Sequence, residues 1–133
     1  MKQDDKELLL KDICARLPYG VKARVYNHWS DDIQDETITI ENLHQLIKTF
    51  SIEDIKPYLF PISSISEEQK KYISDRWGVN EDFDFEIDPN WGEYFVDLCD
   101  SVDFINWCYE NHFDINGLIP KGSALDATDK NIY

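Results

Sequence analysis

The sequence feature that most constrains the fold is an amphipathic helical pattern over residues 91–112. Large apolar side chains recur there every three or four positions and would form one stripe along a helix. The stripe consists of Tyr94, Phe95, Leu98, Cys99, Val102, Ile105 and Tyr109. An alternative is that Asp100 and Ser101 cap a second helix and divide the segment in two. With either arrangement, we expect the helices of this region to carry much of the core.

Two further segments have helical signals. The apolar residues of segment 6–17 share one helix face at fourfold spacing, and Pro18 stops the pattern. Ser66 and Gln69 have the spacing of a capping box, in which each side chain bonds the other residue's backbone N–H. We therefore expect one helix near the N-terminus and another from this box to about Trp77.

The segments between these helices have strand chemistry. Residues 21–25 alternate apolar and basic side chains, and residues 37–40 are rich in β-branched side chains, so the two segments are candidates for a hairpin with a long loop. Residues 41–50 are compatible with a helix or a strand. Two prolines restrict residues 55–62 to a surface connection or an edge strand.

Together these patterns predict one α+β domain over residues 1–125. It would consist of an N-terminal helix, a small antiparallel sheet and two or three further helices. Residues 126–133 follow a turn-rich segment and have no apolar periodicity, so we expect this tail to fray.

The charge of the chain is strongly acidic and unevenly distributed. The net charge is −14, and residues 77–120 contain eleven acids but no Lys or Arg. A field of this sign repels nucleic acid phosphates and anionic membranes and attracts basic partners. We therefore expect no direct binding to nucleic acid or membrane, and a candidate acidic surface that meets a basic protein. Its residues would be Asp82, Asp84, Glu86, Asp88, Glu93, Asp97, Asp100 and Asp103.

Two patterns resemble metal sites but do not complete one. The acids from Asp82 onward have the spacing of an EF-hand calcium loop, yet Ile87 stands where that loop needs Gly for its sharp turn. Cys108 and His112 are four residues apart and would share a helix face, but two ligands do not make a structural zinc site. We expect no metal and no cofactor.

The sequence contains no catalytic motif with a recognisable spacing, so we expect a protein that is not an enzyme. One alternative is a small enzyme or ligand-binding domain with a pocket near His28 or His112. A second alternative is an acidic surface that serves solubility only. His112 itself is expected at a helix end, because a histidine near a helix C-terminus suits the helix dipole.

The three cysteines, Cys14, Cys99 and Cys108, have no spacing typical of a disulfide framework. The polar N-terminus has no signal-peptide pattern, and no apolar run approaches the length of a membrane span. We expect the reducing cytoplasm of a bacterial host cell.

Three stretches in order along the chain carry a family resemblance: KDICARLPYGVK (11–22), IKPYLFPISSISEE (55–68) and HFDINGLIPKGSAL (112–125). They resemble a family of small uncharacterised proteins found in gut Bacteroidetes and in their phages and mobile elements. The resemblance implies a mobile-element or phage-linked cytosolic protein and no particular activity.

From the charge and the resemblance we hypothesise a non-enzymatic protein-interaction module of phage or mobile-element origin. In a sharper form, its spaced carboxylates imitate phosphates and occupy the nucleic-acid-binding groove of a basic host protein.

Overall fold

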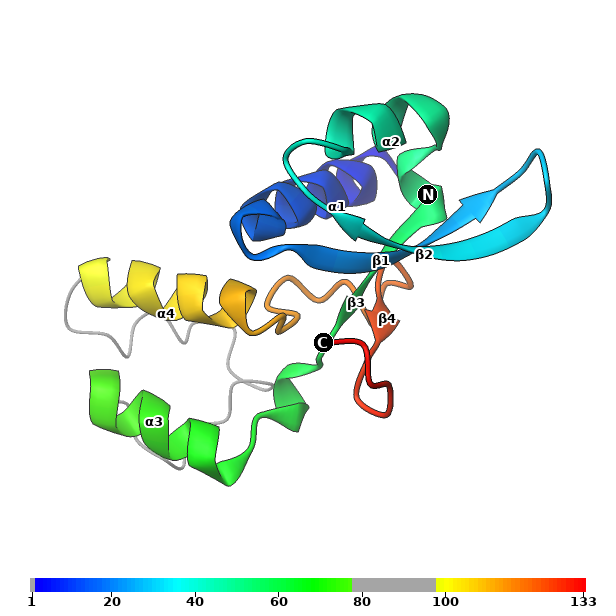
Figure 1. Cartoon of the computed structure of the whole chain (residues 1–133). Helices are drawn as coiled ribbons and strands as arrows, with labels where there is room; N and C mark the ends of the chain where they lie inside the picture. Colours follow the sequence, from blue (N-terminus) through cyan, green and yellow to red (C-terminus); the bar gives the residue numbers. More distant parts are fainter. Residues whose placement is uncertain (1, 78–97) are drawn as a thin grey trace.

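The structure is a computed structural model that describes residues 2–77 and 98–133, with side chains in the second range described from Val102 onward. These residues form an α+β fold, which confirms the predicted class (Figure 1). The helices are α1 (Gln3–Arg16), α2 (Leu43–Thr49), α3 (Glu67–Trp77) and α4 (Leu98–Glu110), and the strands are β1 (Val21–Asn27), β2 (Asp32–Ile38), β3 (Ile55–Leu59) and β4 (Leu125–Asp126).

The helices form where the sequence patterns indicate them. α1 and α3 confirm the predicted helices near the N-terminus and after the capping box. Residues 41–50, which were compatible with a helix or a strand, contain the helix α2. The capping box closes as expected, because Ser66 N donates to Gln69 Oε1 at 2.9 Å and Gln69 N donates to Ser66 Oγ at 3.1 Å. α4 continues from Leu98 past Ser101, so no second helix begins there; residues 91–97 of the predicted segment lie outside the described residues.

The sheet has the strand order β2-β1-β3-β4. β1 is antiparallel to both β2 and β3, as predicted, whereas β3 and β4 are parallel, so the sheet is mixed. β1 and β2 reach Asn27 and Asp32, and their hairpin is therefore longer and its loop shorter than the sequence pattern suggests. Polar residues that read as a loop extend the two strands beyond the core, as the projecting hairpin in Figure 1 shows.

The prediction that residues 55–62 form a surface connection or an edge strand is wrong, because β3 pairs on both sides. Pro57 lies opposite Ala23, and the next pair in this register is Lys22 and Tyr58. The N–H of Lys22 points toward β3, where it donates to the Tyr133 hydroxyl. The N–H and C=O groups of successive residues in a strand point to opposite sides, so those of Ala23 and Pro57 point away from each other. This pair has no hydrogen bond between its two residues, and the missing N–H of proline therefore leaves no bond unmade.

The core has two parts. In the first, α1 and α2 cover one face of the sheet (Figure 1). Its fully buried apolar residues include Leu9, Ile13, Val21, Ala23, Val25, Ile38, Ile55, Leu59 and Leu118. In the second, α3 and α4 lie side by side around Ile65, Ile73, Trp77, Phe104, Cys108 and Phe113. α4 thus carries much of the second part, whereas α1 and the sheet carry the first. The buried face of α4 is not the predicted stripe: Phe104 and Cys108 are buried, whereas Val102 of the stripe is 47% exposed.

The tail from residue 126 makes specific contacts, in contrast to the fraying that the sequence predicts. Ala127 is buried and its N–H donates to the Leu59 carbonyl at 2.8 Å. Lys22 Nζ donates to the Ile132 carbonyl at 2.6 Å. The Tyr133 hydroxyl accepts from Lys22 N at 2.9 Å and donates to the Tyr58 carbonyl at 2.9 Å. A side-chain hydroxyl thereby stands in for a ladder bond between β1 and β3.

We expect Tyr133→Phe to lower the free energy of unfolding by about 1–2 kcal/mol, because two backbone groups lose their shared partner. Urea denaturation measures this change. Tyr19→Phe is the control, since Tyr19 is exposed and its hydroxyl makes no hydrogen bond to a described residue. Equal stability of the two variants would contradict a ladder role for the Tyr133 hydroxyl.

Candidate functional site

Most of the predicted acidic surface lies where the structure gives no side chains. Six of its residues, Asp82, Asp84, Glu86, Asp88, Glu93 and Asp97, are outside the described residues, and the side chain of Asp100 is not described. Asp103 is exposed on α4, with its Oδ2 3.9 Å from Arg76 Nη2 on α3. The prediction of a common acidic surface therefore stays a prediction.

The tip of the β1–β2 hairpin is an organised turn. Asn27 Oδ1 accepts a hydrogen bond from Trp29 N at 2.9 Å. The Tyr26 hydroxyl donates to the carboxylate of Asp31, a residue in the left-handed conformation with φ 54°. That hydrogen bond raises the pKa of Tyr26 above its usual value, so this tyrosine remains a donor. These side-chain contacts fix the path of the chain through the turn.

His28 helps to fix the same turn. Its Nε2 lies 2.7 Å from Asp54 Oδ2, and its ring meets the Tyr26 ring edge to face, with centroids 4.6 Å apart. The imidazole is largely exposed. His28 is one of the two residues near which the sequence left a pocket open. In the structure its side chain links the hairpin tip to the segment before β3.

The organised tip presents a bare indole. Trp29 is 94% exposed and Ile33, on the adjacent strand, is 61% exposed. Residues 27–36 also contain four acids, Asp31, Asp32, Asp35 and Glu36, and no Lys or Arg. Only Asp31 and Asp32 follow the indole closely, since Asp35 lies opposite Arg24 and accepts a hydrogen bond from the Tyr58 hydroxyl. A large apolar side chain exposed on a fixed turn is available for contact with another molecule.

The second candidate position, His112, lies in a surface pocket of about 430 Å³. The pocket is lined by Phe60, Ser64, Gln69, Glu110, Asn111, His112, Phe113, Thr128 and Tyr133. The imidazole stacks on the Tyr133 ring at a centroid distance of 3.6 Å. Neither ring nitrogen of His112 makes a hydrogen bond to a described residue, and Nδ1 is buried.

The backbone at His112 ends α4 in a Schellman turn. His112 has φ 64°, its N–H donates to the Tyr109 carbonyl, and the N–H of Phe113 donates to the Cys108 carbonyl. Glycine is the usual residue at this position, because other residues pay about 1–2 kcal/mol for the left-handed conformation. The chain therefore reverses sharply here and returns toward β3.

His112 lies at the end of α4, as expected, but it is not a cation there. Burial lowers the pKa of His112 to about 4, and the positive charges of Arg16 and Lys22 lower it further. The ring is thus neutral at pH 7. Burial also raises the pKa of Cys108 to about 12, which keeps that thiol protonated. Within residues 2–77 and 98–133, no three His, Cys, Asp or Glu side chains lie together as metal ligands.

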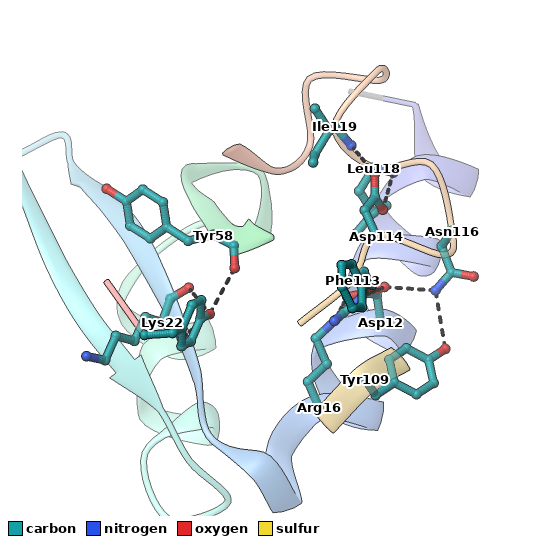
Figure 2. A network of polar contacts seen from close by, with 11 residues as sticks. Asp12, Arg16, Lys22, Tyr58, Tyr109, Phe113, Asp114, Asn116, Leu118 and Ile119 are labelled. Carbon is teal, nitrogen blue, oxygen red and sulfur yellow. Dashed lines mark hydrogen bonds and ion pairs between the residues drawn. The ribbon is translucent and has the colours of Figure 1, made fainter. Parts of the chain in front are cut away.

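A fully buried ion pair joins Asp12 and Arg16, one turn apart on α1 (Figure 2). Arg16 Nε donates to Asp12 Oδ1 at 2.6 Å and Nη2 donates to Oδ2 at 3.1 Å. Nη2 also donates to the Phe113 carbonyl at 2.6 Å, and the guanidinium lies over the Tyr109 ring. The pair joins α1 to the end of α4.

The loop after α4 completes this network. Asn116 Nδ2 donates to Asp12 Oδ2 at 2.8 Å and to the Tyr109 hydroxyl at 3.3 Å. The buried carboxylate of Asp114 accepts from Leu118 N at 2.8 Å and from Ile119 N at 2.9 Å (Figure 2). Sequence reasoning missed this network, although the spacing of Asp12 and Arg16 on a predicted helix was a signal for an ion pair.

No family model, curated protein or solved structure matches the chain. Among the described residues, no helix is both long and apolar enough to cross a membrane.

We expect Asp12→Ala to lower the free energy of unfolding by about 3–5 kcal/mol, because it leaves a buried guanidinium without its carboxylate. Guanidinium chloride or urea denaturation measures the loss. Asp5→Ala is a matched control on α1, since Asp5 pairs with Lys121 at the surface, where such pairs contribute about 1 kcal/mol or less. Losses of similar size for the two variants would contradict a structural role for the buried pair.

The neutral state of His112 predicts an acid sensitivity. Its folded pKa is below the unfolded value, so protonation favours the unfolded chain, and stability is lost as the pH falls from about 6.5 to 4. His112→Asn, which tolerates the left-handed backbone, removes that part of the loss. Urea titrations at several pH values check this, with His44→Asn on the surface of α2 as the control. An unchanged pH profile in His112→Asn would refute the assignment.

Proposed function

We propose that this protein is a non-enzymatic interaction module that binds a basic protein surface through the tip of the β1–β2 hairpin. The observation that carries the proposal is Trp29, which is 94% exposed on a turn held by three side-chain contacts. Asp31 and Asp32, which follow the indole within three residues, give the tip its preference for a basic partner.

A partner that covers the hairpin tip would bury the Trp29 indole. Burying a tryptophan side chain against a partner contributes on the order of 2–4 kcal/mol, and tryptophan is enriched among the residues that dominate binding energies. The turn is already fixed by Asn27, Asp31 and His28, so little backbone entropy remains to be lost on binding. A rigid, exposed indole therefore suits recognition better than stability.

Charge adds selectivity over distance. The net charge of −14 attracts basic proteins before contact, and the four acids of residues 27–36 oppose basic groups within the contact. The acid-rich segment 77–120 extends the same preference. A nucleic-acid-binding host protein is a partner of suitable charge, which keeps nucleic-acid mimicry in a phage or mobile-element setting as the sharper form of the proposal.

The pocket at His112 supports a small-ligand or enzymatic function less well. Several of its polar groups already serve the fold: Ser64 Oγ donates to the Pro61 carbonyl, and Gln69 Oε1 accepts from Ser66 N. Asn111 Nδ2 donates to the Trp107 carbonyl and Thr128 Oγ1 donates to the Asp126 carboxylate. Few polar groups are left to converge on a ligand.

We expect Trp29→Ala to weaken binding to a purified basic partner by roughly 30-fold, which corresponds to about 2 kcal/mol, without changing stability. The partner is captured from a bacterial lysate, identified, purified and titrated by calorimetry. Ile40→Ala is the matched control, because Ile40 is 71% exposed beyond the other end of β2.

The charge component has its own test with the same partner. Asp32→Asn combined with Glu36→Gln should lower the affinity at low salt and reduce its salt dependence. The proposal is abandoned if every captured partner binds Trp29→Ala and Ile40→Ala equally well.

A further inference from the structure

The outer edge of the sheet at β2 has a defined set of unpaired backbone groups. β2 is the first strand in the order β2-β1-β3-β4, so one of its sides has no strand neighbour among the described residues. Near the end of β2, the Thr37 carbonyl accepts a hydrogen bond from Asn42 Nδ2 at 2.7 Å. This side-chain contact closes the edge at one end and shows that the peptide groups of Thr37 point away from β1.

A second contact gives the same orientation independently. Lys22 pairs with Thr37, and the N–H of Lys22 points toward β3, where it meets the Tyr133 hydroxyl. Two antiparallel partners that turn their peptide groups away from each other form a non-hydrogen-bonded pair. Because peptide groups alternate in direction along a strand, every second pair is of this type. Two further non-hydrogen-bonded pairs are therefore Arg24–Asp35 and Tyr26–Ile33.

The N–H and C=O groups of Ile33 and Asp35 consequently face outward, away from β1. No hydrogen bond joins these four groups to a described residue. They lie on the strand that leads away from the Trp29 turn, and Ile33 itself is 61% exposed. The edge from Ile33 to Asp35 is thus a short open template for one more strand.

We propose that this edge accepts an extended basic segment of a protein partner as an added strand beside Trp29. The inference rests on the proposed function and specifies the partner that the hairpin tip binds. Backbone hydrogen bonds to Ile33 and Asp35 supply the pairing, and alternate side chains supply the selectivity.

Charge and register define the segment. Asp32 and Glu36 are exposed or half-buried and lie on one face of β2, whereas Ile33 lies on the other face. The added strand therefore presents Lys or Arg side chains on the first face and an apolar residue opposite Ile33. A second copy of this chain does not fit, because its own β2 edge would place carboxylates opposite Asp32 and Glu36.

The test uses a dye-labelled synthetic peptide in which lysine and valine alternate. Ile33→Pro removes one outward N–H and leaves the β1–β2 ladder intact, since edge strands tolerate proline at such positions. It should weaken peptide binding by about tenfold or more, whereas the control Ile33→Val should bind within about twofold of the parent. N-methylation of alternate peptide residues should also abolish binding.

Amide hydrogen exchange in the unchanged protein gives a second readout that needs no variant. The added strand should slow exchange at Ile33 and Asp35, which face outward, and should leave Gln34, already bonded to β1, unchanged. Peptide binding without this protection, or full binding to Ile33→Pro, overturns the inference, as does a peptide that does not bind.

If Trp29→Ala loses its protein partner while Ile33→Pro keeps it, strand addition fails but the proposed function stands; if both variants keep it, both fail.

Discussion

The buried ion pair between Asp12 and Arg16 is the interaction on which the rest of the structure depends. Removing two charges from water costs several kcal/mol each, and the pair is stable because its polar atoms other than Arg16 Nη1 are bonded. Those bonds come from α1 itself, from the Phe113 carbonyl and from Asn116. Because α1 belongs to the first core cluster and Phe113 to the second, the pair fixes one cluster against the other.

The path of the chain after α4 follows from this constraint. To bring the Phe113 carbonyl to Arg16, the chain has to turn back within two residues of the helix end, and the Schellman turn at His112 does this. The turned segment then pairs with Phe60, the residue directly after the end of β3. Tyr133 links this segment to β1 and β3, with its hydroxyl on Lys22 and Tyr58 and its ring on His112.

The sequence predicts those elements whose causes are local. The capping box at Ser66 and the apolar face of α1 act within one turn of a helix, and both predictions are confirmed. The buried position of β3 was missed, because proline argues against a central strand unless its nitrogen faces away from the neighbour, and only the register with β1 decides that. The hairpin tip was missed for a similar reason: the polar residues 27–35 read as a loop, and only their pairing makes Trp29 stand alone on a fixed turn.

Binding and stability are separated along the β1–β2 hairpin. At its base, Val21, Val25 and Ile38 are fully buried and contribute to the first core cluster. At its tip, Trp29 and Ile33 lie outside both clusters, and the contacts that hold the turn come from surface side chains. The base therefore resists unfolding while the tip remains open to a partner. In the interaction that we propose, the acidic field of the whole chain would select the sign of the partner's charge over about a Debye length, and the indole and the open strand edge would determine how the partner docks.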